Sequence, residues 1–244
     1  MRPLIAATLA LAGCSASPIP DATCNSVQFE TARHVVCVVP RDADIRLRLR
    51  DADGAPLGTF DALLDDLDAP VFMAMNGGMY HADRDPVGLY VEAGETLAPL
   101  VAGAGPGNFG MVPNGVFWSD GERVHVTETD AFAALEAEPR FATQSGPMLV
   151  VDGALHPRFR RDSDSLKRRN GVGVTEEAVV FAISDEPVNF HHFARLFRDR
   201  YGADNALFLD GSISMIHAPE LDRREKGGTL GPMIAVMADR TDPD

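Results

Sequence analysis

Cysteine and the larger aromatic residues are scarce in this sequence of 244 residues, which has three cysteines, one tryptophan and three tyrosines. The cysteines form no C-x-x-C pair and no cysteine–histidine spacing of a zinc site. The apolar stretch near the N-terminus, residues 3–11, is far shorter than a membrane span. A P-loop and a G-x-S-x-G nucleophile elbow are also lacking, so neither a nucleotide hydrolase nor a serine hydrolase is supported.

Basic residues are outnumbered, with 22 lysines and arginines against 36 aspartates and glutamates, and the formal net charge is −14 at pH 7. This excess of negative charge argues against nucleic acid as a partner. An anionic substrate would need a local cluster of positive charge, because the overall field would repel it. Hydrophobic residues make up 45% of the chain, which is enough for one domain with a sizeable core.

The N-terminus carries a targeting signal. Arg2 and a short apolar stretch precede Leu11-Ala12-Gly13-Cys14, which resembles the lipobox of bacterial lipoproteins. We predict a signal peptide over 1–13, a lipidated Cys14, a tether over 14–23 and a folded domain over 24–244. Ser15 after the cysteine favours the periplasmic face of the outer membrane, with membrane contact through the anchor only. The alternative is an ordinary signal peptide that is cleaved after a small residue.

The other two cysteines, Cys24 and Cys37, have two interpretations. In an oxidising cell envelope they could form a disulfide that closes a short loop. They could equally be two buried apolar thiols.

Strand-like runs dominate the chain and predict an α/β (α+β) fold, a single domain with a mixed β-sheet core flanked by helices. Apolar residues at helical spacing are confined to three segments, of which the clearest precedes Gly202. The expected helices are 59–68, 130–138 and 189–201. The expected strands are 45–49, 71–75, 88–92, 116–119, 124–127, 148–151, 179–183, 206–209 and 233–237.

Glycine and polar residues flank apolar runs at four places. Asp210-Gly211-Ser212 follows the run 206–209, and Asn76-Gly77-Gly78 follows the run 71–75. Gln144-Ser145-Gly146-Pro147 precedes a run, and Arg169-Asn170-Gly171 opens a strand pair. Open sheets place ligand groups at strand ends, and glycines let backbone N–H groups converge on an anion. We therefore expect one polar pocket, with four independent turns as the alternative.

The expected cluster of positive charge lies within twelve positions of the chain. It consists of Arg158, Arg160, Arg161, Lys167, Arg168 and Arg169. Such a run is commonly a solvated surface. Arg169 differs because it leads into the glycine-rich strand, where a planar guanidinium could bind phosphate with two parallel hydrogen bonds.

These four segments, in this order, resemble the phosphodiester glycosidase family over about residues 24–238, in a bacterial branch. The resemblance implies a hydrolase that releases a sugar from a sugar-1-phosphodiester or a related envelope glycan. It implies catalytic roles for Asp210, Arg169 and Asn76. The substrate-binding residues would be Gly77, Gly78, Gln144, Ser145, Gly146, Asn170, Gly171, Gly211 and Ser212.

The sequence departs from the family after Gly211, where Ser212, Ile213 and Ser214 stand in place of a glycine-rich stretch. Bulkier residues beside the aspartate motivate an alternative function. In that alternative the protein is a lipoprotein of the same fold that binds a glycan or an anionic polymer without cleaving it.

Glycoside cleavage passes through an oxocarbenium-like state and ordinarily requires two carboxyl groups. A phosphate leaving group is already a stable anion, so stabilisation of its charge matters more than its protonation. Arg169 suits that task, and Asp210 could stabilise the sugar cation, activate water or act as the nucleophile. Candidates for a second carboxylate are Glu92, Asp185 and Glu186.

We expect no cofactor and no metal site. The alternative is a divalent cation such as calcium at Asp83 and Asp85, in the segment that starts with His81, as in a metal-dependent phosphodiesterase. His191 and His192 are adjacent on a predicted helix and point in different directions, so they form a poor metal pair.

Overall fold

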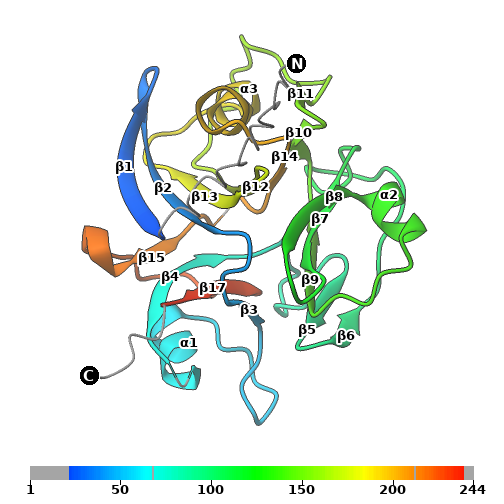
Figure 1. Cartoon of the computed structure of the whole chain (residues 1–244), viewed down its shortest axis with the longest axis vertical. Helices are drawn as coiled ribbons and strands as arrows, with labels where there is room; N and C mark the ends of the chain where they lie inside the picture. The colour runs from blue at the N-terminus through cyan, green and yellow to red at the C-terminus, as the bar shows by residue number, and fades with distance from the viewer. Residues whose placement is uncertain (1–21, 68, 212, 239–244) are drawn as a thin grey trace, which may run out of the picture.

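The computed structural model describes residues 22–67, 69–211 and 213–238, which fold into three β-sheets with short helices (Figure 1). The predicted single domain of the α/β type is confirmed. The one mixed sheet that we expected is three sheets, and all their described strand pairs are antiparallel.

The largest sheet has seven strands in the order β1-β2-β13-β12-β14-β10-β11. Its strands are β1 (Thr23–Phe29), β2 (Ala32–Pro40), β10 (Met148–Val151), β11 (Ala154–Leu155), β12 (Asn170–Val174), β13 (Ala178–Ser184) and β14 (Asn205–Phe208). The inner strands β12 and β13 are buried along their whole length, which explains their continuous apolar and glycine composition.

The second sheet has the order β16-β15-β4-β17-β3, and the third has the order β6-β5-β9-β7-β8. The second contains β3 (Ile45–Arg48), β4 (Val71–Asn76), β15 (Ile216–Ala218), β16 (Arg223–Arg224) and β17 (Met233–Met237). The third contains β5 (Tyr90–Glu92), β6 (Glu95–Ala98), β7 (Gly115–Ser119), β8 (Val124–Glu128) and β9 (Phe141–Ser145). One apolar cluster joins all three sheets and includes Phe181, Met75 and Phe117. This shared core makes the sheets one domain.

Three short helices lie outside the sheets. Thr59 caps α1 (Phe60–Asp66), α2 (Thr129–Ala134) lies beside β7 and β8, and Asn189 caps α3 (Phe190–Arg195). α3 continues as a π-helical segment, Leu196–Arg200, and the chain turns away at Gly202, whose φ is +67°. None of the described helices is long and apolar enough to cross a membrane.

The hairpin formed by β1 and β2 was not predicted from the sequence. β1 is polar and partly exposed, so its sequence shows no strand pattern, and it begins at Thr23, the last residue of the expected tether. β2 is a mostly buried apolar run, whose pattern was overlooked. Cys24 and Cys37 face each other across the hairpin and form a disulfide. This decides between the two interpretations of these cysteines in favour of the disulfide.

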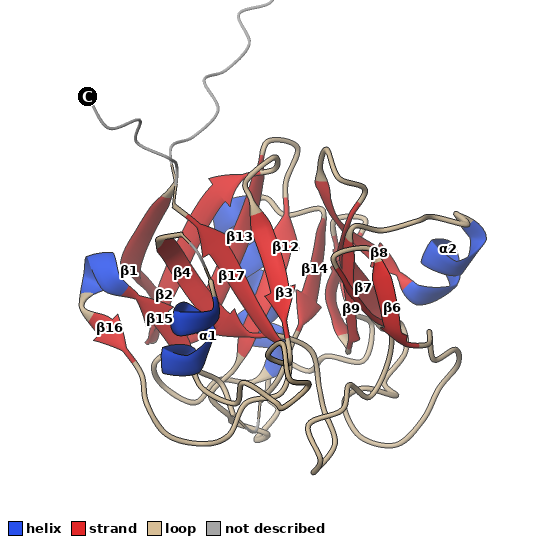
Figure 2. Cartoon of the chain, turned by 90° about the horizontal axis from the view of Figure 1, so that it is seen from below, coloured by secondary structure: helices blue, strands red, loops and turns tan. Residues whose placement is uncertain are grey.

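The ends of several strands meet on one side of the molecule. β4 ends at Asn76 opposite the start of β17, and β14 ends just before Asp210, beside the start of β12. Long loops gather at one end of the strands, as Figure 2 shows. The fold therefore brings together segments that are more than a hundred residues apart in the sequence.

Candidate active site

Buried hydrogen bonds join the four segments that the sequence analysis singled out. The Asn170 side-chain amide donates to the backbone oxygen and to Oδ1 of Asn76, at 3.0 Å each, and Asn170 Oδ1 accepts from the backbone N–H of Asp210 at 2.9 Å. Ser145 Oγ donates to the carbonyl of Leu209 at 2.7 Å. Asn170 is thus the central connection of the group, and its side chain is fully buried.

We expect replacement of Asn170 by alanine to lower the free energy of unfolding by about 2–4 kcal/mol. The change leaves the Asp210 N–H without its described buried partner and removes the amide that donates to two oxygens of Asn76, of which Oδ1 keeps the Met215 N–H. Unsatisfied buried groups are costly. Chemical denaturation of the variant and of the parent protein measures the effect. A loss below about 1 kcal/mol, the net value of a single ordinary hydrogen bond, would contradict this bridging role.

A cavity of about 570 Å³, which we call the site cavity, opens beside this group. Arg169 and Asp210 both line it, although they come from different segments of the chain. The other lining residues are Met79, Asn108, Ser165, Lys167 and Gly211. A cavity of this size can take a sugar together with a phosphate group.

Arg169 is a buried cation. Its side chain is 1% exposed, and no described carboxylate pairs with it. Nε donates to the carbonyl of Val188 and Nη2 to that of Ser165, at 2.8 Å each. A guanidinium has five N–H donors, so these two bonds orient the group and leave three donors for a ligand. Burial lowers the pKa of Arg169 to about 10, so the group stays charged at neutral pH and an anion would stabilise it.

Stacked aromatic rings support the guanidinium. Arg169 Cζ lies 3.7 Å from the ring centroid of Phe190, which stacks on Phe159 at 5.0 Å and an interplanar angle of 7°. Phe159 in turn stacks on His156 at 4.7 Å. Phe208 meets Phe190 edge-on, and its ring lies so close to Gly211 that a Cβ there would stand 2.9 Å away. Phe208 therefore packs between Phe190, which contacts Arg169, and Gly211, which follows Asp210.

We expect Phe190→Leu to lower kcat/KM for an anionic substrate by about tenfold, because the guanidinium loses its cation–π contact and its orientation. Phe190→Tyr, which keeps the ring face, should restore most of the loss. The matched control is Phe197→Leu, a fully buried phenylalanine in the same helical region whose described ring contact is with Phe193. Equal losses of kcat/KM in the two leucine variants would contradict a positioning role for Phe190.

The alternation of an extended chain explains which basic residues reach the site cavity. Ser165, Lys167 and Arg169 stand two residues apart and all line it. Arg168 points elsewhere and binds Glu225 with two hydrogen bonds, at 2.6 and 3.0 Å. Lys167 is exposed and has no described carboxylate partner.

Asp210 contributes the only carboxylate among the described lining residues of the site cavity. Its backbone is held by Asn170 and by Ser214, whose Oγ donates to the Asp210 carbonyl at 2.9 Å. The pKa of the nearby Tyr80 is raised, mainly by burial and then by the negative charge of Asp210. The fold thus holds a carboxylate and a guanidinium in one cavity.

Comparisons with known proteins show the family of this chain. The profile of the phosphodiester glycosidase family matches residues 70–228, a range that includes both Arg169 and Asp210. The chain belongs to the phosphodiester glycosidase family. This confirms the resemblance that the four segments indicated.

A bacterial relative and a solved structure extend the comparison. The uncharacterized protein YigE of Escherichia coli strain K12 is 38% identical over 196 residues, which are 79% of this chain and 74% of that protein. The zebrafish N-acetylglucosamine-1-phosphodiester alpha-N-acetylglucosaminidase catalytic domain, auto-inhibited by its pro-peptide, has a similar fold. The TM-score is 0.62 over 92% of this chain and 85% of that chain, at 14% identity, so the likeness concerns the fold.

Several residues of the four segments have structural partners in this member of the family. Both polar atoms of the Gln144 side chain are engaged, Oε1 by the N–H groups of Leu89 and Val101 and Nε2 by the Val101 carbonyl. Ser145 is bound to Leu209, as described above. Neither side chain lines the site cavity.

The glycines of the four segments are required mainly by close packing. A Cβ at Gly78 would lie 2.5 Å from Thr143 Oγ1, and one at Gly146 would lie 2.7 Å from Asn114 Cβ. A Cβ at Gly171 would lie 2.7 Å from the Leu207 carbonyl in the neighbouring strand. Gly77 donates its N–H to the Pro232 carbonyl at 2.7 Å. Of the predicted glycines, Gly211 alone lines the site cavity within the described chain.

Asn76 does not line the site cavity but is bound to Asn170, which holds the backbone of Asp210. It is fully buried, its Oδ1 accepts from Asn170 and from the Met215 N–H at 2.8 Å, and its Nδ2 has no partner in the described chain. Ser212 and Cys14 lie outside the described residues.

The three candidates for a second carboxylate lie elsewhere, which corrects that expectation. Glu92 binds Arg48 and the Tyr90 hydroxyl, at 2.8 and 2.9 Å. Asp185 pairs with Arg223, and Glu186 pairs with Arg33. Long-range ion pairs hold all three, and none lines the site cavity.

The aspartates considered as an alternative calcium site, Asp83 and Asp85, bind protein groups in the structure. Asp83 accepts from the Asp85 N–H at 3.1 Å, and Asp85 pairs with Arg50. Among the residues that the structure describes, no three histidine, cysteine or acidic side chains group as metal ligands.

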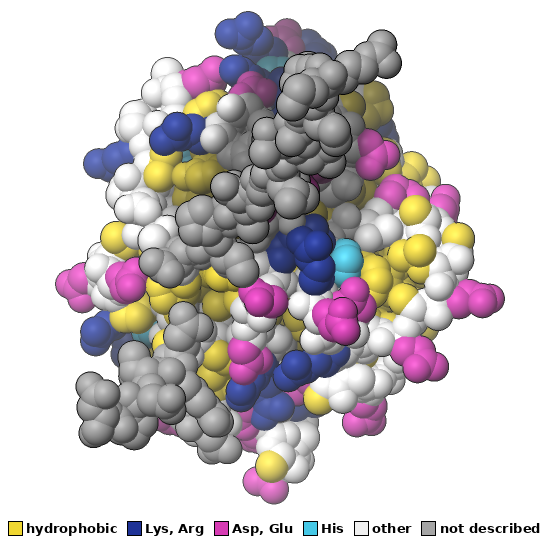
Figure 3. Space-filling model, in the orientation of Figure 1, with side chains coloured by type: hydrophobic (Ala, Val, Ile, Leu, Met, Phe, Trp, Pro, Cys, Tyr) yellow, Lys and Arg dark blue, Asp and Glu magenta, His cyan; other side chains and the backbone are white. Residues whose placement is uncertain are grey.

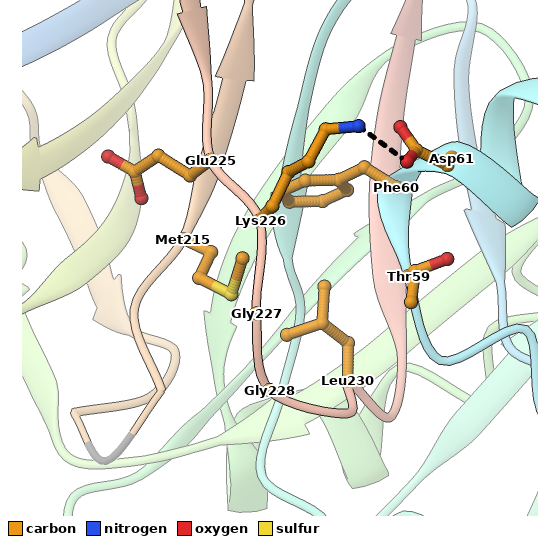
Figure 4. A pocket seen from close by; sticks show the side chains of 9 residues that line it. All are labelled: Thr59, Phe60, Asp61, Met215, Glu225, Lys226, Gly227, Gly228 and Leu230. Atoms are coloured by element: carbon orange, nitrogen blue, oxygen red, sulfur yellow. Dashed lines mark hydrogen bonds and ion pairs between the residues drawn. The ribbon is translucent and has the colours of Figure 1, made fainter.

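A smaller cavity lies between α1 and the glycines Gly227 and Gly228 (Figure 4). Its volume is about 60 Å³, too small for a sugar, and the Lys226–Asp61 ion pair of 2.8 Å crosses it. Among the described residues that line the site cavity, the sequence analysis did not name Met79, Asn108 or Ser165, and it named Lys167 only as a member of the basic cluster. The spacing of two residues between Lys167 and Arg169 could have predicted that both side chains reach the same cavity.

Proposed function

We propose that the protein hydrolyses the bond between the anomeric carbon of a sugar and a phosphodiester, releasing free sugar. The observation that carries this proposal is a buried guanidinium without a described carboxylate partner, Arg169, in the same cavity as the carboxylate of Asp210. Family membership supports the same class of reaction.

The charges of the site cavity suit a phosphodiester. Its described lining carries two cations, Lys167 and Arg169, and one carboxylate, Asp210. A phosphodiester has a single negative charge, so its binding neutralises the cavity. The free N–H donors of Arg169 then stabilise the second charge that develops on the phosphate as the glycosidic bond breaks.

Asp210 acts on the sugar side of the bond in this proposal. The anomeric carbon becomes positive as the phosphate departs, and a nearby carboxylate stabilises that charge. The phosphate leaves as an anion that needs no proton, so a mechanism without a second carboxylic acid is chemically adequate. This agrees with the placement of Glu92, Asp185 and Glu186 outside the site cavity.

Hydrolysis in ¹⁸O-labelled water tests the proposal. We expect the full chain to convert a glycosyl phosphodiester into free sugar that carries the label and an unlabelled phosphomonoester. Label in the phosphate, with sugar-1-phosphate as the product, would instead indicate a phosphodiesterase. Binding without any turnover would favour the alternative function of a glycan-binding protein, which the bulky residues Ile213 and Ser214 after Gly211 motivate.

We also propose that the protein is anchored in the bacterial cell envelope through Cys14. The first described residue, Ala22, lines a cavity with Phe72 near the start of β4, whereas Asn76 at the end of β4 is connected through Asn170 to Asp210 of the site cavity. An anchor at the first of these ends would leave the site accessible. We expect Cys14→Ser to move the protein from the membrane fraction to the soluble fraction with unchanged kcat/KM on a soluble substrate. Retention of this variant in the membrane fraction would contradict the anchor.

A further inference from the structure

The loop between β11 and β12 carries six basic residues of a chain whose net charge is −14. Arg160 pairs with Asp162 and Arg168 with Glu225, and Arg169 belongs to the site. The remaining three are exposed and have no carboxylate partner in the described part of the chain. We call these residues, Arg158, Arg161 and Lys167, the basic track.

Contacts on both sides hold the loop that carries the basic track. Asn189 Nδ2 donates to the carbonyls of Arg161 and Ser163, at 3.1 Å each, and so ties the loop to the start of α3. Lys167 and Val188 exchange two backbone hydrogen bonds, at 2.8 and 3.1 Å. The track is therefore a formed surface with fixed backbone positions.

One end of the basic track enters the site cavity, because Lys167 lines it together with Ser165. The other end reaches the neighbourhood of α3, where Figure 3 shows lysine and arginine side chains gathered at the upper edge of the molecule. The pKa of His191 on α3 is lowered by burial and then by Arg195, Arg161 and Arg198, so three guanidinium groups lie near it. Arg195 and Arg198 are paired with Glu30 and Asp199, whereas Arg161 has no described carboxylate partner. A surface of this kind attracts anions that the rest of the protein repels.

We propose that the substrate is a polyanionic glycan with a negative charge on successive repeats, of which one diester occupies the site cavity and the next ones lie along the basic track. This inference rests on the proposed function. Lys167 and Arg169 already neutralise a single diester inside the cavity, so the exposed cations of Arg158 and Arg161 would have no role in binding a substrate with one charge. A substrate with repeated anionic groups at short spacing would place further negative charges beside these exposed cations.

The test compares two substrates, a single glycosyl phosphodiester and an oligomer of four glycosyl phosphate repeats. We expect the full chain to show a higher kcat/KM on the oligomer, and Arg158→Ser/Arg161→Ser to lower the oligomer-to-monomer ratio of kcat/KM by about tenfold at low salt. The difference should disappear near 1 M salt because exposed charges are then screened.

The matched control is Arg123→Ser/Arg140→Ser, which also removes two cations. Both positions flank the Ser119 end of β7, where it pairs with Phe141 at the start of β9, whereas Ser145 at the other end of β9 contacts the site. This variant should keep the ratio of the parent protein. An oligomer-to-monomer ratio near one in the parent, or an equal fall in both variants, would overturn the inference.

Failure of the proposed function gives a different result. If neither substrate is cleaved, calorimetric binding of the same oligomer still tests the basic track. About tenfold weaker binding by Arg158→Ser/Arg161→Ser, with binding by the control variant unchanged, supports the polyanionic ligand without the reaction. Equal affinity of all three proteins would overturn it.

Discussion

Replacement of Arg169 by alanine is expected to lower kcat on a glycosyl phosphodiester by at least about a hundredfold. Removal of one well-placed donor to a developing negative charge has an effect of this size. The guanidinium is oriented by the Val188 and Ser165 carbonyls and by the Phe190 ring, and the ammonium group of Lys167 in the same cavity cannot form the two parallel bonds of a guanidinium. Steady-state kinetics of the purified variant, with its melting temperature as a check on folding, measures the loss.

Arg168→Ala provides the matched control because it removes the adjacent arginine, which points away from the site cavity toward Glu225. It should leave kcat within about threefold of the parent value, since a partly exposed ion pair contributes mainly to stability. Arg169→Lys should recover little activity, because a lysine ammonium cannot form the two parallel bonds of a guanidinium. Activity of Arg169→Ala close to that of Arg168→Ala would exclude a role for Arg169 in the reaction.

Much of the sheet structure could be predicted because its strands are buried apolar runs. The run 233–237 became β17 with the same bounds, and the run 71–75 became β4 with one added residue, Asn76. The helices are shorter than their apolar spacing indicated, and the segment 59–68 contains a helix only from Phe60 to Asp66. β1 could not be found because it is stabilised by pairing with β2 and by the disulfide of Cys24, not by an apolar pattern.

The sequence predicted that the four segments lie together, but it did not predict which of their residues line the site cavity and which make structural contacts. Gln144 and Asp210 both lie at strand ends beside glycine, yet Gln144 binds a loop that starts 43 residues earlier, at Val101, while Asp210 lines the site cavity. Glu92 was equally plausible as a second carboxylate until the structure paired it with Arg48. Partners so far apart in the sequence leave no local signal.

Asp210→Asn should separate binding from the chemical step. The substitution keeps the size of the side chain and the backbone contacts with Asn170 and Ser214 while it removes the negative charge. We expect kcat to fall by about a thousandfold, the range for loss of a group that acts directly on the reacting atoms. Affinity for inorganic phosphate should rise instead, because the variant loses the one described carboxylate that repels the anion inside the site cavity.

This prediction is easy to contradict because kcat is expected to fall while the affinity for phosphate is expected to rise. A substitution that only disturbed the fold would weaken phosphate binding and turnover together, whereas loss of the carboxylate weakens turnover alone. Titration calorimetry with phosphate and steady-state kinetics on the same preparation measure both quantities. If phosphate binding weakens in Asp210→Asn, or kcat stays within tenfold of the parent value, the carboxylate does not share a working cavity with Arg169 and the proposed reaction loses its basis.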